Sequence, residues 1–211
     1  FGKIKVSQRS IEIFSGWKEK HDDDIGWISN GYSFPAYNIE DEKKLKDLMN
    51  IQHSFGLNIE WISPQEYEEL VPGINTEGLR GSTYSPDDGS ASPLLALNAF
   101  YFKSLEFGAE YKFNENVINI ELTDNKISQI ITDKGKYSAG TIINASGNNA
   151  KEIGEMIGID LPVIPDSHEG AITEPVERFF EPMVVDMRPT EGSANYYFYQ
   201  NNEGQVIFCI T

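Results

Sequence analysis

The stretch Thr141-Ile-Ile-Asn-Ala-Ser-Gly-Asn-Asn-Ala150 decides how the rest of the sequence is interpreted. Its first three residues are apolar or β-branched, which is typical of a buried strand. Small residues follow, and an amphipathic helix then begins beyond Gly147. A strand that ends at a glycine and opens a helix leaves free backbone N–H groups, where a phosphate or pyrophosphate can bind. A plain strand-to-helix turn is the alternative, and on these residues alone it is the stronger interpretation.

Short alternating segments lead into this stretch from the N-terminal side. Apolar and polar residues alternate over 111–113, 117–121 and 127–132, with a short piece at 136–137. Turn-forming residues separate them at 123–125 and 133–135. The pattern predicts a small antiparallel meander.

The residues before the meander favour helices, with short strands between them. Apolar spacing predicts helices over 3–20, 39–55 and 92–107, and strands over 25–37, 57–62 and 79–84. Ser63, Pro64 and Glu66 form a helix-start signal, which predicts a capped helix ending near Leu70. After the meander, strands are expected over 170–175, 183–187, 195–200 and 205–210, with a hairpin turn at 201–204. We therefore predict an α+β fold that contains α/β elements.

The charge balance excludes two classes of partner. Acidic residues number 33 against 17 basic ones, for a net charge of -16. Nucleic acids and anionic membranes both require basic patches, so neither is expected as a partner. No apolar run reaches a transmembrane length and no signal peptide opens the chain. A single cysteine, Cys209, fits a reducing cytoplasm, and Cys/His metal spacing is absent, so no metal site is predicted.

Neither end of the sequence has the features expected of a natural chain end. Phe1-Gly2 begins without a methionine, and Thr211 directly follows the apolar run 206–210. We interpret the chain as a piece of a longer polypeptide, whose last strand would offer an edge near Ile210 to another strand.

The order of several motifs is more specific than any one of them. They are SPDDGSASP (85–93), FGAEYKFNENVINIE (107–121), DKGKYSAGTIINASGNNA (133–150), LPVIP (161–165), TEPV (173–176) and NYYFYQNNEGQVIFCIT (195–211). This order resembles the middle of the FAD-dependent amino acid and amine oxidoreductases of the glycine oxidase, sarcosine oxidase β-subunit and D-amino-acid oxidase type. The resemblance implies an incomplete FAD-binding domain with a β-meander plus a mixed-sheet substrate domain. It divides the chain into a substrate and helical part at 1–78, a partial FAD-binding domain at 79–160 and a substrate-domain sheet at 161–211.

The resemblance also implies roles for individual residues. Val117 matches the meander position whose backbone lies against the adenine of FAD, and Ala145 and Gly147 match small residues that line the dinucleotide. Tyr197 matches a strand position that faces flavin and substrate, although a core tyrosine is the plainer alternative. His168 could orient a substrate or tune a flavin, although a surface histidine is the preferred interpretation.

Two arginines are candidates for binding the substrate, but neither is predicted to do so, and no catalytic residue is assigned. Arg178 and Arg188 could bind a substrate carboxylate, but in the family the residue that does so commonly lies later in the chain. The implied reaction is hydride transfer from a small amino acid or secondary amine to FAD, giving an imine. The family's G-x-G-x-x-G motif is absent from these 211 residues, so we expect the chain alone to bind FAD weakly or not at all and to be inactive. The alternative is a non-catalytic domain or subunit that binds substrate or assembles with a partner subunit.

Overall fold

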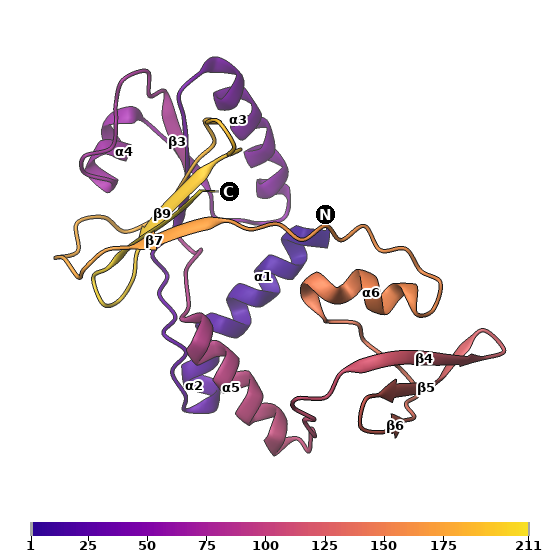
Figure 1. Ribbon diagram of the computed structural model, residues 1–211. Helices are drawn as coiled ribbons and strands as arrows, with labels where there is room; N and C mark the ends of the chain where they lie inside the picture. The colour runs from indigo at the N-terminus through magenta and orange to yellow at the C-terminus, as the bar shows by residue number, and fades with distance from the viewer. Residues whose placement is uncertain (1, 211) are drawn as a thin grey trace. The chain divides into compact units, whose positions relative to one another are not determined.

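The computed structural model describes residues 2–210, which form two compact units. The larger unit combines the chain up to Glu106 with the residues from His168 onward, and the smaller unit contains Phe107–Ser167. Figure 1 shows a sheet with helices in the first and a three-stranded sheet with a short helix in the second. The predicted fold class, a mixture of helices with a mixed sheet and a small antiparallel sheet, is confirmed. The functional division at residues 78 and 160 stays a prediction.

Within residues 2–210, the larger sheet has seven strands, which come from both ends of the chain. In spatial order they are β2 (Glu60–Ile62), β3 (Gly81–Ser85), β1 (Tyr32–Ala36), β8 (Met183–Asp186), β9 (Tyr196–Gln200), β10 (Val206–Ile210) and β7 (Glu169–Ile172). The β1–β8 pair is parallel and the other neighbours are antiparallel. The predicted free edge at Ile210 is wrong, because β10 is paired on both sides and β7 takes the edge.

The described residues of the larger unit form five helices: α1 (Gly2–Ser15), α2 (Trp17–His21), α3 (Ile39–Ser54), α4 (Pro64–Leu70) and α5 (Pro93–Glu106). The single helix predicted over 3–20 is divided at Gly16. The capping box is confirmed, since the Ser63 side chain accepts from the Glu66 N–H and the Glu66 carboxylate accepts from the Ser63 N–H. The strand predicted over 25–37 shortens to β1, because Ile28 bonds instead to the loop residue Ser90.

Alternation along the strands divides the larger sheet into two faces. Ser33 points to the side covered by α4, where its hydroxyl lies 3.0 Å from that of the fully buried Tyr67. Val184 lies on the same side and belongs with Tyr67 to the main core, which also contains Ile62, Val71, Leu79 and Phe180. Because side chains alternate, Tyr32 and Phe34 must lie on the opposite face.

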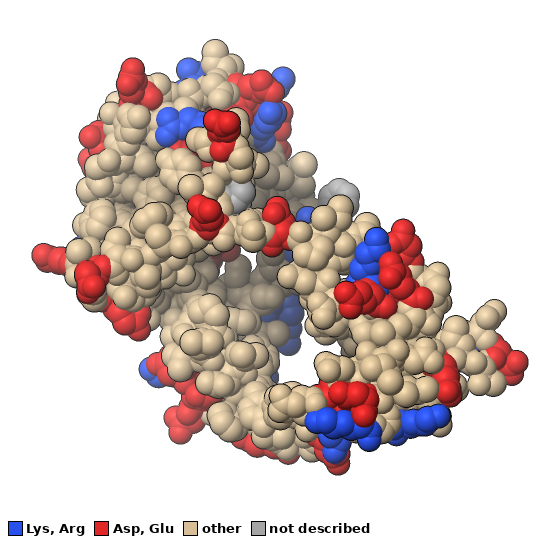
Figure 2. Space-filling model, in the orientation of Figure 1, with Lys and Arg blue, Asp and Glu red and all other residues tan. Residues whose placement is uncertain are grey.

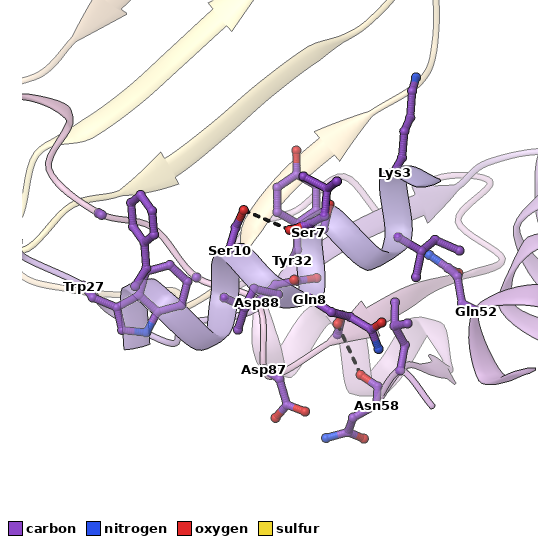
Figure 3. A pocket seen from close by; sticks show the side chains of 18 of the residues that line it. Lys3, Ser7, Gln8, Ser10, Trp27, Tyr32, Gln52, Asn58, Asp87 and Asp88 are labelled. Atoms are coloured by element: carbon purple, nitrogen blue, oxygen red, sulfur yellow. Dashed lines mark hydrogen bonds between the residues drawn. The ribbon is translucent and has the colours of Figure 1, made fainter. Parts of the chain in front are cut away.

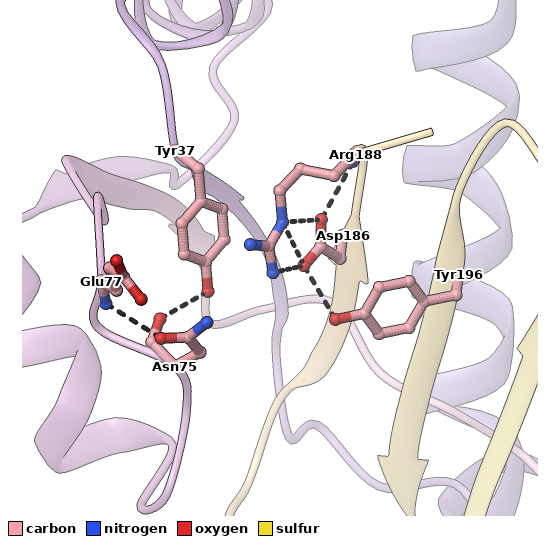
Figure 4. Close-up of polar contacts among 6 residues, drawn as sticks. All are labelled: Tyr37, Asn75, Glu77, Asp186, Arg188 and Tyr196. Atoms are coloured by element: carbon pink, nitrogen blue, oxygen red, sulfur yellow. Dashed lines mark hydrogen bonds and ion pairs between the residues drawn. The ribbon is translucent and has the colours of Figure 1, made fainter. Parts of the chain in front are cut away.

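A buried ion pair closes one end of this sheet (Figure 4). Asp186, 1% exposed at the end of β8, accepts from Arg188 Nε at 3.0 Å and Nη2 at 2.6 Å, and from Tyr196 Oη at 2.9 Å. The guanidinium of Arg188 stacks on the ring of Tyr37, 3.6 Å from its centroid. Tyr37 Oη donates to the carbonyl of Asn75 at 2.8 Å. One charge network therefore joins β8 and β9 to the segment that follows α4.

Burial alone would raise the pKa of Asp186, because a carboxylate withdrawn from water loses its hydration. The hydrogen bonds from the side chain and backbone of Arg188, together with the one from Tyr196, outweigh that effect and hold the pKa below its usual range. The carboxyl group of Asp186 is therefore ionised in the folded chain near neutral pH.

The smaller unit contains the predicted meander. Strands β4 (Val117–Thr123), β5 (Lys126–Thr132) and β6 (Lys136–Tyr137) pair in sequence order as an antiparallel sheet. Asp124 and Asn125 both have positive φ angles, 51° and 58°, which suits a tight two-residue hairpin turn. A 3₁₀ turn (η1, Gly147–Asn149) and the short helix α6 (Ala150–Glu155) complete the regular structure.

The strand predicted at 141–143 is wrong. These residues form no strand, and Ile143 is 85% exposed. A β-branched run favours extended backbone, but a strand forms only when a neighbour accepts its hydrogen bonds. Within the described part of the smaller unit, β4, β5 and β6 pair among themselves and none pairs with this run. Residues 111–113 likewise form no strand.

Candidate functional site

A cavity of about 920 Å³ lies in the larger unit, between α1 and the face of the sheet that carries Tyr32 and Phe34 (Figure 3). Its wall also includes the C-terminal end of α3 with the residues that follow it, and the loop at 85–91. The size is within the range of small-molecule sites. The cavity is thus formed by elements that lie far apart in the sequence.

Contacts from Gln8 and Phe14 attach α1 over the cavity. Gln8 Nε2 donates to the carbonyl of Phe55 at 2.9 Å, just beyond the end of α3. Near the C-terminal end of α1, the ring of Phe14 packs edge-on against Trp27, with centroids 6.1 Å apart, and also against Phe100, with centroids 5.8 Å apart. Because α1 has no fully buried residue, these contacts matter for holding it in place.

Aromatic side chains make up the floor of the cavity. The rings of Tyr32 and Phe34, two residues apart on β1, lie 5.3 Å from each other. The Trp27 indole N–H donates to Ser29 Oγ at 3.1 Å, which fixes its ring on the cavity wall. Burial, followed by the nearby charge of Asp88, raises the pKa of Tyr32. The phenol of Tyr32 is therefore protonated at neutral pH.

The acidic loop at 85–91 forms another part of the wall. Backbone bonds anchor it, with the Gly31 N–H donating to the Asp88 carbonyl at 2.8 Å and Ile28 and Ser90 exchanging two bonds. Asp87 is exposed, whereas Asp88 is half-buried. Burial raises the pKa of Asp88, and a hydrogen bond from Ser85 opposes the shift in part. The tight turn predicted for this loop therefore also places a carboxyl group in the cavity.

Tyr197 lies on the same face of the sheet as Tyr32. It pairs with Val185 on β8 and Cys209 on β10, whereas its neighbour Phe198 pairs with Val184 of the main core. Its hydrogen bond with Cys209, followed by burial and the proximity of Tyr199 and Tyr32, raises the pKa of Tyr197 to about 12. The predicted alternation, with Tyr197 and Tyr199 on one face and Tyr196 and Phe198 on the other, is confirmed.

The three residues predicted to contact FAD lie in the smaller unit. Val117 is half-buried and opens β4, opposite Thr132. Ala145 and Gly147 are exposed on the turn before α6. Gly147 has a φ of 55°, and a Cβ atom there would meet nothing within 4 Å. The glycine is therefore needed for its backbone conformation, and the space beside it is open to a ligand.

Asn144 organises this turn, a role that the sequence interpretation missed. Its side-chain oxygen accepts from Ser146 Oγ at 2.6 Å, and its Nδ2 donates to the carbonyl of Ala150 at 2.9 Å. The spacing of an Asn two residues before a Ser is the local signal, because Asn side chains commonly bond to groups two residues on. An exposed, side-chain-poor turn held from one side is compatible with a dinucleotide on the other.

Comparison with known proteins identifies the family. Residues 2–211 match the family described as FAD dependent oxidoreductase (DAO). The chain belongs to this family. It is 29% identical over 157 residues to the mitochondrial sarcosine dehydrogenase of Mus musculus, covering 72% of this chain and 17% of that protein. It is 23% identical over 210 residues to sarcosine oxidase subunit beta from Arthrobacter sp, covering 96% of this chain and 50% of that protein.

Among solved structures, L-proline dehydrogenase from P. horikoshii matches with a TM-score of 0.84 and 29% identity, covering 97% of this chain and 54% of that one. The chain therefore spans between 17% and 54% of the length of these three proteins. The resemblance inferred from the ordered motifs is confirmed by the family match, which extends through both compact units.

The remaining positions considered from the sequence, His168, Arg178 and Arg188, are not among the described residues that line the cavity. His168 is exposed and directly precedes β7. Arg178 Nη2 donates to the carbonyl of Asn201 at 2.9 Å, and Arg188 is engaged by Asp186, so the guanidinium groups of both arginines are used within the fold. Among residues 2–210, no group of three or more His, Cys, Asp or Glu is placed to hold a metal ion. No helix in that range is long and apolar enough to cross a membrane.

Proposed function

We propose that this chain supplies the substrate-binding sheet and part of the FAD site of an oxidoreductase that oxidises a small amino acid or a secondary amine. The observation that supports it best is the tyrosine-bearing face of the sheet. Tyr32 lines the cavity, and Tyr197 and Tyr199 lie on the same face. The names of the relatives, sarcosine dehydrogenase and L-proline dehydrogenase, support a secondary amine as substrate.

The side chains of this face have defined tasks in the proposal. The phenol of Tyr197, protonated at neutral pH, donates a hydrogen bond to a substrate oxygen and thereby orients the substrate. The rings around Tyr32 exclude water from it. FAD, if bound, would supply the hydride acceptor for oxidation of the carbon that carries the amine to the imine. Val117, Ala145 and Gly147 are the residues proposed to contact FAD, through backbone and small side chains.

The role of Tyr197 can be tested in the full-length protein against a matched tyrosine. Tyr197→Phe removes a hydroxyl from the proposed substrate face, and we expect kcat/KM for amine oxidation to fall about tenfold, the value of one lost hydrogen bond. Tyr196→Phe removes the neighbouring hydroxyl, which bonds Asp186 on the other side of the sheet. That variant should unfold more easily but keep its kcat/KM. Equal losses of kcat/KM in the two variants would contradict the proposal.

We also infer that residues 1–211 by themselves bind FAD weakly. The turn at Ala145 and Gly147 is short and exposed, and a pyrophosphate needs several backbone or charged donors. A titration of the purified chain with FAD, followed by visible absorption and tryptophan fluorescence, should show no saturable binding at micromolar FAD. Co-purified yellow flavin would contradict this inference and would show that Val117 and the turn suffice.

A second function, a non-catalytic subunit, is supported by one structural observation. β7 lies at the edge of the larger sheet and all four of its residues are exposed. An exposed edge strand can pair with a strand of another chain. The native mass of the full-length protein, together with its flavin content, separates the two functions, since a colourless hetero-oligomer favours the subunit and a yellow protein favours the enzyme.

A further inference from the structure

Asp88 is a half-buried carboxyl group on the cavity wall that the proposed function does not yet use. In the part of the chain that the structure describes, no Lys, Arg or His lies within ion-pair distance of it. Figure 3 shows it beneath α1 among the lining side chains, whereas Asp87 points away from that helix. A carboxylate withdrawn from water without a cationic partner is costly, and a bound cation would relieve that cost.

The charges around Asp88 favour a positively charged ligand. The wall carries two carboxyl groups, Asp87 and Asp88, and one ammonium group, Lys3 at the start of α1. The Ser85 hydroxyl near Asp88 carries no charge and donates to the Asn58 carbonyl at 3.2 Å, so it does not neutralise the carboxyl group. The cavity therefore has a negative potential near Asp88, which attracts cations.

Aromatic rings lie beside this carboxyl group. Tyr32 is close enough for the charge of Asp88 to raise its pKa, and the ring of Phe34 packs against that of Tyr32 at a tilt. Trp27 is on the same wall, with its indole N–H already bonded to Ser29. The faces of such rings attract cations, and methylated ammonium groups are bound in proteins by this combination of rings. A carboxylate beside several rings matches both the charge and the apolar surface of an alkylated ammonium group.

We propose that Asp88 determines the specificity of the cavity by binding the positively charged, N-alkylated amine of the substrate, while Trp27 and Tyr32 contact its N-alkyl groups. This inference rests on the proposed function, because it names the group by which the substrate is selected. A neutral molecule with the same shape as the substrate binds poorly, since it leaves the Asp88 carboxylate without a counter-ion.

The test compares two probes of equal shape in the full-length protein. Choline carries a quaternary ammonium group, and 3,3-dimethylbutan-1-ol has a carbon in place of that nitrogen and no charge. We expect isothermal titration calorimetry to show that the unchanged protein binds choline about tenfold more tightly than the alcohol. Asp88→Asn should abolish this preference by weakening choline binding about tenfold while leaving the alcohol unaffected. Asp87→Asn, the matched control, removes the same charge one residue away and should change either affinity less than threefold.

Several outcomes overturn the inference. They are an absence of preference for choline in the unchanged protein, an unaltered preference in Asp88→Asn, and an equal loss in Asp87→Asn. Asp88→Glu keeps the charge and should retain at least part of the preference for choline. This variant distinguishes the loss of the charge from misfolding of Asp88→Asn. Amine oxidation and flavin content are measured separately. If the protein contains flavin and oxidises amines but binds both probes equally, only the role of Asp88 is disproved. If the protein is colourless but binds choline more tightly than the alcohol, only the oxidoreductase proposal is disproved.

Discussion

Replacing Asp186 with alanine is expected to lower the free energy of unfolding by about 3 kcal/mol, measured by urea denaturation of the chain. The substitution leaves the guanidinium of Arg188 without its partner and the hydroxyl of Tyr196 without its acceptor. The value lies at the lower end of the range for broken buried ion pairs, because the Arg188 side chain is 37% exposed and water can solvate part of it. The loss should also loosen the segment around Asn75, which Tyr37 connects to the network.

The surface pair of Glu40 and Lys44 provides the matched control. Their side chains are 78% and 65% exposed, and they are one helical turn apart on α3. Glu40→Ala should leave the free energy of unfolding nearly unchanged, since exposed ion pairs contribute little. If Asp186→Ala is as mild as this control, the network does not hold the sheet end together.

The same network predicts how stability depends on pH. The pKa of Asp186 is lower in the folded chain than in an unfolded one, so the folded state holds its proton less tightly. The contribution of the Asp186 network to the free energy of unfolding is complete above about pH 4, the pKa of an unfolded aspartate. It is lost as the pH falls through the lower pKa of the folded state. Asp186→Asn should flatten this part of the curve of unfolding free energy against pH, whereas Glu40→Gln should leave most of it.

Replacing Tyr67 with alanine should destabilise the chain by about 4 kcal/mol, because the side chain is fully buried and its removal leaves a large hole in the core. Tyr67 contacts the core formed with Ile62, Val184 and Phe180, between α4 and the sheet. Burial raises the pKa of Tyr67, so the phenol stays neutral and serves as a hydrogen-bonding group.

Tyr67→Phe separates the ring from the hydroxyl. The variant loses the bond to Ser33 Oγ, but Ser33 still donates to the Met183 carbonyl at 3.2 Å. We therefore expect a loss of about 1 kcal/mol in the free energy of unfolding. Thermal and urea unfolding of both variants would separate the contribution of the ring from that of the hydroxyl. A phenylalanine variant as unstable as the alanine variant would show that the hydroxyl, rather than the packing of the ring, stabilises this core.

Elements with local signals could be predicted from the sequence. The helix α4 begins where Ser63 and Glu66 predict it, because a capping box involves residues only three apart. The hairpin at Asp124 and Asn125 follows from the tolerance of those residues for positive φ angles. The two faces of β9 follow from alternation alone, which correctly placed Tyr197 opposite to Tyr196.

Features that depend on distant partners could not be predicted. No local signal reveals that β1 pairs with β8, or that the run at 141–143 has no strand to pair with. The cavity depends on where α1 packs, and the burial of Asp88 depends on that packing in turn. From the sequence, the acidic loop could therefore be predicted only as a turn. The position of the Asp88 carboxyl group in the cavity could not be predicted, because it depends on the fold.

The parallel pairing of β1 with β8 also affects how the chain is made. Ser33 and Met183, which are hydrogen-bonded across this pair, are 150 residues apart. At a synthesis rate of roughly 5–20 residues per second, β8 leaves the ribosome about 8–30 s after β1. The smaller unit is continuous in sequence and emerges within that interval, so it can fold while the larger sheet still lacks its centre. During that time the side of β1 that later receives β8 is open to other strands, so the nascent chain is most exposed to aggregation, and most in need of a chaperone, before residue 183 is made.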